Sequence, residues 1–80
     1  MESDLERMAE IVRDLFDEYE GPVARSLSAR DVAQWDSLAN VQFVVLVEQS
    51  FGVRFSTAEV GRFKDVGELL DIVQMKREAG

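Results

Sequence analysis

The strongest constraint on the fold of this 80-residue chain is the stretch 36–52, in which a helix start precedes a long apolar run and a helix stop follows it. Asp36 is a favoured N-cap residue, because its carboxylate can accept hydrogen bonds from the free N–H groups of a first turn. Gly52 is a favoured residue after a last turn, since glycine adopts the left-handed conformation without strain. The stretch therefore predicts one long helix over about 36–51.

This helix is apolar on two opposite sides. At about 100° per residue, one group of side chains forms a stripe wide enough to face a core: Phe43, Val44, Val47 and Phe51. A second group falls on the other side: Leu38, Val41 and Val45. Such a helix is either central and buried all round, or it presents one face to a partner. Because Gln42 and Gln49 flank the second group, the partner-facing interpretation is favoured.

Three further helices are indicated by capping signals. Ser3-Asp4-Leu5-Glu6 opens an amphipathic helix over about 4–19, and Gly21-Pro22 ends it. Ser56-Thr57-Ala58-Glu59 opens a short helix of about 57–62, and Asp65-Val66-Gly67-Glu68 opens the last one.

A long loop, about 20–35, joins the first and second helices. Leu27 and Val32 are expected to pin it to the core, with a turn near 28–32. We therefore expect a single domain over 1–80 of all-α class. It is a small antiparallel four-helix bundle, with three main helices and one short helix.

Composition narrows the function. Sixteen acidic and nine basic residues give a formal net charge of −7, which argues against nucleic acid and anionic membranes as partners and favours basic protein surfaces. The chain has no Cys and no His, so thiolate–metal sites, Cys nucleophiles and His-based triads are excluded. No secretory signal or membrane-spanning run is recognisable. We expect a cytoplasmic monomer that is not an enzyme and binds no metal.

Ser37 has three interpretations. It is a common residue at a helix start, which needs no functional explanation. As a nucleophile it would need a base, but no motif ties Lys64 or Lys76 to it. As a modification site it would place a phosphodiester at a helix N-terminus, where free N–H groups favour an anion. Only the third interpretation also accounts for the missing catalytic residues and the second apolar group.

Taken together, several motifs resemble the acyl carrier protein family, of free-standing type. They are Asp36-Ser37-Leu38, then Glu48-Gln49-Ser50-Phe51-Gly52-Val53, then Phe55-Ser56 with Glu59, and Phe63-Lys64-Asp65-Val66-Gly67-Glu68-Leu69. The resemblance covers about residues 5–73. It implies a phosphoprotein in which Ser37 receives 4′-phosphopantetheine from coenzyme A through a separate phosphopantetheinyl transferase. The thiol of this group would hold acyl intermediates as thioesters.

The resemblance also implies roles for the neighbouring residues. Asp36 corresponds to an acid that helps to engage the transferase and its magnesium ion. Three positions correspond to apolar docking residues: Leu38, Val41 and Val45. Glu48 and Glu59 correspond to acids that meet basic surfaces of loading, condensing or tailoring enzymes. If the domain shelters its cargo, the pocket is expected between the second and third helices, near Val44, Phe63 and Val66.

The chain departs from the carriers of fatty acid biosynthesis, which are acidic just after the serine. Here Ala39, Asn40 and Gln42 occupy those places, and Trp35 stands where a small residue is usual. These departures favour a specialised pathway, such as polyketide, modified-lipid or other secondary-metabolite biosynthesis, with Trp35 contributing to partner choice. The alternative is an unmodified helical protein–protein interaction module that docks through the same three apolar positions.

Overall fold

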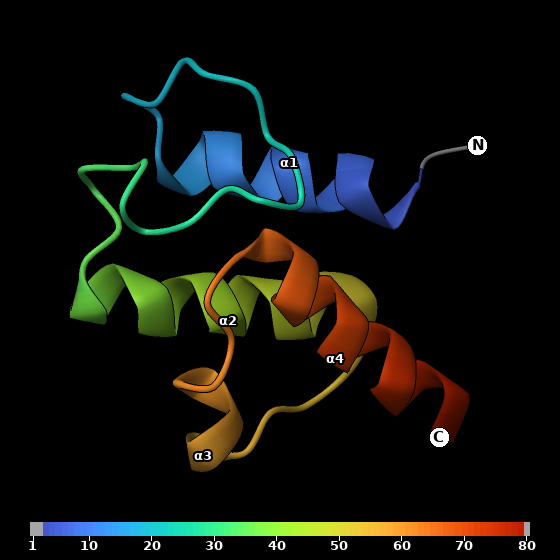
Figure 1. The fold of residues 1–80 in the computed structure, drawn as a ribbon. Helices are drawn as coiled ribbons and strands as arrows, with labels where there is room; N and C mark the ends of the chain where they lie inside the picture. Colours follow the sequence, from blue (N-terminus) through green and yellow to red (C-terminus); the bar gives the residue numbers. More distant parts are fainter. Residues whose placement is uncertain (1–2, 80) are drawn as a thin grey trace.

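The computed structural model describes residues 3–79, and within that range the protein contains helices and no strand. They are α1 (Asp4–Leu15), α2 (Ser37–Phe51), α3 (Thr57–Val60) and α4 (Val66–Ala79) (Figure 1). The all-α fold and the four-helix bundle with a long first loop are confirmed. None of these four helices is long and apolar enough to cross a membrane.

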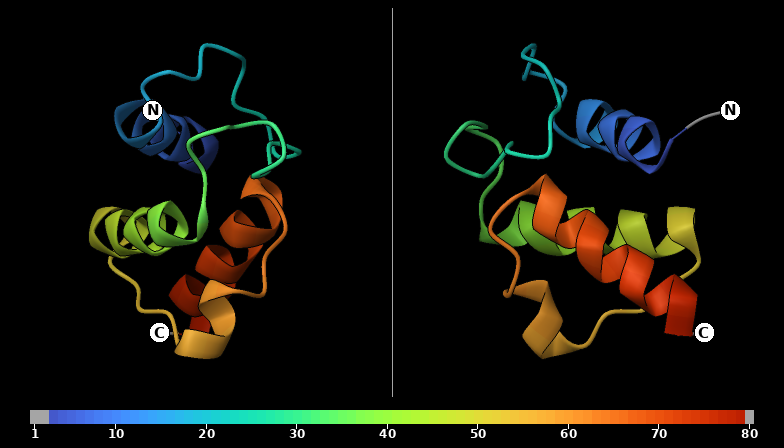
Figure 2. Two further views of the ribbon diagram at one scale, coloured as in Figure 1. Left: turned by 90° about the vertical axis from the view of Figure 1, so that its left-hand side faces the viewer. Right: turned by 45° about the vertical axis from the view of Figure 1, so that its right-hand side comes forward.

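The helices α1, α2 and α4 surround a shared centre when they are viewed along α2 (Figure 2). Helices α1 and α2 run in opposite directions, and α4 crosses α2 obliquely (Figure 1). The short α3 lies on the other side of α2 and α4 from α1. The first turn of α2, which holds Ser37, therefore lies at one end of the bundle, between the long loop and α3.

Helix α1 is shorter than predicted. Phe16 leaves the helical conformation with φ −108° and ψ 64°, so the predicted end near residue 19 was wrong by about one turn. The reason is a contact that apolar spacing does not encode. The backbone N–H of Glu18 donates to the side-chain oxygen of Gln34 at 3.0 Å, and thus bonds to the loop instead of to α1. Helix α3 also ends early, at Val60 instead of residue 62.

The long loop is held against the start of α4 by backbone hydrogen bonds. The N–H groups of Val66 and Gly67 donate to the carbonyl oxygens of Leu27 and Arg25, at 2.9 and 2.8 Å. A Cβ at Gly67 would lie 3.0 Å from the Arg25 carbonyl oxygen, which is tighter than most Cβ contacts, so glycine favours this approach. Leu27 and Val32 are buried, which confirms that they pin the loop.

Three aromatic rings anchor the end of this loop to the core. Trp35 stacks on Phe16 with ring centroids 5.4 Å apart and meets Phe43 edge-on at 5.1 Å. Offset-stacked and edge-to-face pairs are the favoured aromatic geometries. The side chains of Phe16 and Phe43 are fully buried. The cluster therefore fixes the backbone two residues before Ser37 to both α1 and α2.

Candidate functional site

Ser37 is the first residue of α2, and its side chain is exposed. Asp36 caps the helix as predicted, since its carboxylate accepts a hydrogen bond from the N–H of Ala39 at 2.8 Å. Within residues 3–79, no group forms a hydrogen bond with the Ser37 hydroxyl. A hydroxyl in this position is open to an incoming enzyme, and the positive end of the helix dipole beside it favours an attached anion.

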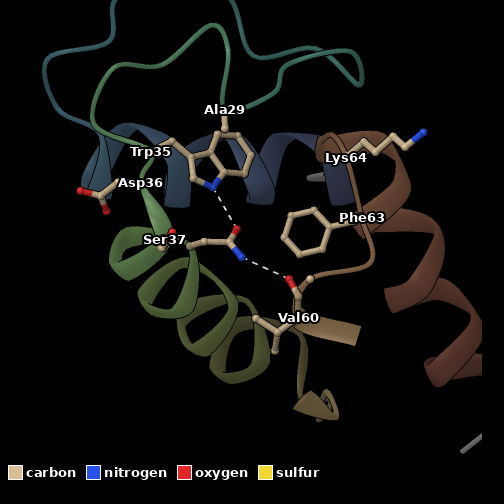
Figure 3. Close-up of a pocket in the computed structure, with 9 residues that line it drawn as sticks. Ala29, Trp35, Asp36, Ser37, Val60, Phe63 and Lys64 are labelled. Atoms are coloured by element: carbon tan, nitrogen blue, oxygen red, sulfur yellow. Dashed lines mark hydrogen bonds between the residues drawn. The ribbon is translucent and has the colours of Figure 1, made fainter. Parts of the chain in front are cut away.

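A surface hollow of about 430 Å³ lies beside Ser37. We call it the hollow, and its lining consists of Ala29, Trp35, Asp36, Ser37, Asn40, Val60, Gly61, Phe63 and Lys64. Figure 3 shows the Trp35 indole and the Phe63 ring at the hollow, with Val60 below them. The hollow thus joins the loop end, the first turn of α2 and the end of α3.

Asn40 links the two sides of the hollow. Its side-chain oxygen accepts a hydrogen bond from the indole N–H of Trp35 at 2.9 Å, and its side-chain N–H donates to the Val60 carbonyl at 3.1 Å (Figure 3). Asparagine carries both a donor and an acceptor, so one side chain can serve both contacts. The residue therefore connects the loop, α2 and α3 at the site.

The hollow is shallower than the cargo pocket expected from the sequence. Phe63 lines it, but Val44 and Val66 do not, because they are 3% and 0% exposed and belong to the packed interior. The space expected between α2 and α3 is thus filled by apolar side chains near those two valines. Ser37 and Phe63 line the same hollow, so a group on Ser37 has Phe63 within the same surface depression.

The second apolar side of α2 is exposed, so the helix is not buried all round. We define the apolar face as Leu38, Val41, Val45 and Leu46, with exposed fractions of 70, 50, 42 and 36%. Sequence reasoning missed Leu46, although at about 80° from Leu38 it borders the same side of the helix. The apolar face begins one residue after Ser37, so an enzyme that covers it also reaches the serine.

Two acids expected to meet partners are used within the fold. Glu48 accepts a hydrogen bond from the N–H of Phe55 at 2.7 Å, which holds the connector after α2. Glu59 lies 2.8 Å from the Lys76 ammonium and caps α3 at Ser56. The hydrogen bond from Lys76, with a smaller contribution from Ser56, lowers the pKa of the Glu59 carboxyl below its ordinary value of 4.5. Both carboxylates therefore stabilise the fold through contacts that do not need a partner.

Trp35 is not on the surface that a partner would contact. Its side chain is 7% exposed, its ring faces Phe16 and Phe43, and its N–H is taken by Asn40. The expectation that Trp35 contributes to partner choice by direct contact does not agree with this burial. An indole next to two core aromatics gains more from burial than from exposure, which explains its position. Trp35 therefore acts on the site as part of the lining of the hollow and through its hydrogen bond to Asn40.

Neither a protein-family model nor a curated protein matches the chain. Among solved structures, the solution NMR structure of the holo acyl carrier protein from Geobacter metallireducens is similar, with a TM-score of 0.81 and 33% sequence identity. The match covers 94% of this chain and 86% of that protein. Identity at this level over nearly the full length of both chains, with the same helical fold, shows that this chain belongs to the acyl carrier protein family.

Proposed function

We propose that Ser37 carries a 4′-phosphopantetheine group whose thiol holds acyl intermediates as thioesters and presents them to biosynthetic enzymes. The observation that carries this proposal is the exposed Ser37 hydroxyl at the start of α2, in a chain whose solved relative is a holo acyl carrier protein. The chain supplies the attachment point and the docking surface, and separate enzymes supply the chemistry.

The residues around Ser37 fit the attached group. A separate phosphopantetheinyl transferase would direct the Ser37 oxygen at the pyrophosphate of coenzyme A. The Ser37 oxygen would bond to the phosphorus that carries pantetheine, the pyrophosphate P–O bond would break, and adenosine 3′,5′-bisphosphate would leave, with the hydroxyl proton passing to a base of the transferase. The backbone N–H groups of Ser37 and Leu38 precede the first helical hydrogen bond, which Asn40 donates to Asp36, so they can face the phosphate. Asp36 lies beside the reacting oxygen, and we assign it the contact with the magnesium ion of the transferase.

Enzymes of one pathway would dock on the apolar face. Leu38, Val41 and Val45 are its most exposed members and would contact the transferase and the later acyl-loading, condensing or tailoring enzymes. An exposed apolar patch beside a functional group is typical of an interaction site. The first turn of α2 carries no acid, and Glu48 is bonded within the fold. This low density of free acids after Ser37 supports a specialised pathway, such as polyketide or modified-lipid synthesis, over general fatty acid synthesis. We place that pathway in the cytoplasm.

The attachment is tested by mass. Incubation of the purified chain with coenzyme A, magnesium and a transferase of broad specificity is expected to add one phosphopantetheine unit. Tandem mass spectrometry of the peptide that contains Ser37 should locate the added mass on that serine. An unchanged mass, with a known carrier modified in the same tube, would show that this chain is not a carrier. A mass on another residue would contradict the assignment of Ser37.

The exposed apolar face also supports a second candidate, an unmodified interaction module that docks through Leu38, Val41 and Val45. Both functions predict that a charge on this face prevents docking. We expect Val41→Asp to lower the kcat/KM of the transferase by about 10- to 100-fold, as expected for roughly 1.4–3 kcal/mol of lost contact and desolvated charge. Steady-state kinetics measures it.

Met75→Asp is the matched control for that charge. Met75 lies on α4 and is 70% exposed, so the substitution adds the same charge at an exposed apolar side chain outside α2. Equal losses in the two variants would mean that the apolar face has no special role.

A further inference from the structure

Helix α3 is flanked in the sequence by Phe55 and Phe63, which are partly buried and pack against the core. It has four residues, and none of them is buried. A helix this short is not stable on its own, since most helical stability in proteins comes from packing. Two links tie it to the bundle: the Asn40 side chain donates to Val60 from α2, and Lys76 pairs with Glu59 from α4. Beside the packing of Phe55 and Phe63, these two contacts therefore hold α3 over the bundle.

Asn40 is the link that lies next to Ser37. Its amide is held on one side by the Trp35 indole, which Phe16 and Phe43 keep in place, and on the other by the Val60 carbonyl. After these two bonds, the amide still has one N–H and one oxygen lone pair. Asn40 lines the hollow together with the rings of Trp35 and Phe63. The hollow thus combines ring surfaces with unused amide groups.

We propose that the hollow binds the part of the prosthetic group nearest to Ser37, and that Asn40 is a positioning residue that holds α3 closed and keeps the acyl cargo outside the bundle. This inference rests on the proposed carrier function. Pantetheine contains two amides, which can bond to the remaining donor and acceptor of Asn40. A hollow of about 430 Å³ is within the usual range for small-ligand sites, roughly 300–1,000 Å³. The hollow favours short acyl groups as cargo, because a short chain can remain outside the packed interior between α2 and α3.

The interior itself supports this restriction. Val44, Val66 and Phe43 are at most 3% exposed, and close-packed interiors leave no room for a chain. A long acyl group could enter between α2 and α3 only if α3 moved away. Asn40 bonds to both Trp35 and Val60, so a movement of α3 away from α2 would break the Asn40–Val60 hydrogen bond next to Ser37.

The test loads Ser37 from coenzyme A, acetyl-coenzyme A and dodecanoyl-coenzyme A with a broad-specificity transferase, and mass spectrometry confirms each product. A failure to load concerns the proposed function, not this inference. In the loaded wild type, we expect shifts of the Trp35 indole N–H and the Asn40 side-chain amide in ¹H–¹⁵N spectra. The amides of Val44 and Val66 should be the same in the acetyl and dodecanoyl forms. Unmoved Trp35 and Asn40 signals, or valine shifts that depend on chain length, would overturn the inference.

Two variants test the role of Asn40. Asn40→Asp keeps an acceptor for Trp35 but loses the donor to Val60, and Asn40→Ala loses both. In each, amide exchange in α3 should rise about fivefold or more, as expected for a lost hydrogen bond of about 1 kcal/mol. The dodecanoyl chain should now shift the Val44 and Val66 amides. Gln42→Ala, on the exposed side of α2, should behave as the wild type.

Asn40→Asp keeps this test decisive if Asn40→Ala does not fold, because it preserves the contact with Trp35. Asn40 does not control the entry of the acyl chain if amide hydrogen exchange in α3 is unchanged in Asn40→Asp. The same conclusion follows if the dodecanoyl chain does not shift the Val44 and Val66 amide signals in that variant.

Discussion

A Ser37→Ala variant is expected to fold like the wild type and to accept no phosphopantetheine. The hydroxyl of Ser37 has no partner among residues 3–79, so its removal leaves no buried group unsatisfied. The cap of α2 comes from Asp36, not from Ser37, and alanine is a good helix former. The free energy of unfolding should therefore change by less than about 0.5 kcal/mol, which is usual for surface substitutions.

The measurement combines intact mass after the transferase reaction with a thermal unfolding curve. Ser50→Ala is the matched control, because Ser50 is an exposed serine in the same helix. It should gain the full phosphopantetheine mass. If Ser37→Ala still gained the mass, the attachment site would lie elsewhere. If Ser37→Ala supported the native pathway while Val41→Asp did not, the unmodified interaction module would be the better description.

The parts of this fold that could be predicted from the sequence are those set by local chemistry. Ser3, Asp36 and Ser56 each cap a helix as expected, since a cap needs only a side chain and the N–H groups two or three residues on. Gly52 ends α2 with φ 69°, as glycine at that position predicts. The two-sided character of α2 also followed from helical periodicity alone.

The parts that could not be predicted depend on contacts between distant residues. The early end of α1 follows from a bond between Glu18 and Gln34, which no local pattern announces. The burial of Trp35 follows from two phenylalanines on different helices. The sequence shows Asn40 only as a neutral residue where an acid is usual. Its two hydrogen bonds, to Trp35 and Val60, depend on the tertiary fold. The candidate site was located by its motif, whereas its surroundings were set by tertiary packing.

The aromatic cluster that supports the site is also where a single substitution should cost the most stability. Phe43 is fully buried and touches both other rings, with centroids 6.0 Å from Phe16 and 5.1 Å from Trp35. Replacement of a buried phenylalanine by alanine removes its transfer free energy and leaves a cavity, at a cost of about 3–5 kcal/mol. The cavity would lie between α1, α2 and the end of the loop, so little can collapse into it without moving Ser37.

Phe43→Ala is therefore expected to be largely unfolded at 25 °C, because a single core in a domain of this size supplies only about 3–5 kcal/mol in total. Trp35 is the chain's one tryptophan, so its fluorescence reports directly on the cluster. Urea denaturation followed by that signal and by circular dichroism gives the change in unfolding free energy. Met75→Ala, at an exposed position, should change it by less than about 0.5 kcal/mol. A loss of less than about 1 kcal/mol in Phe43→Ala would show that the aromatic cluster does not hold the loop end and α2 together. The conclusion that the cluster fixes the backbone before Ser37 would then be wrong.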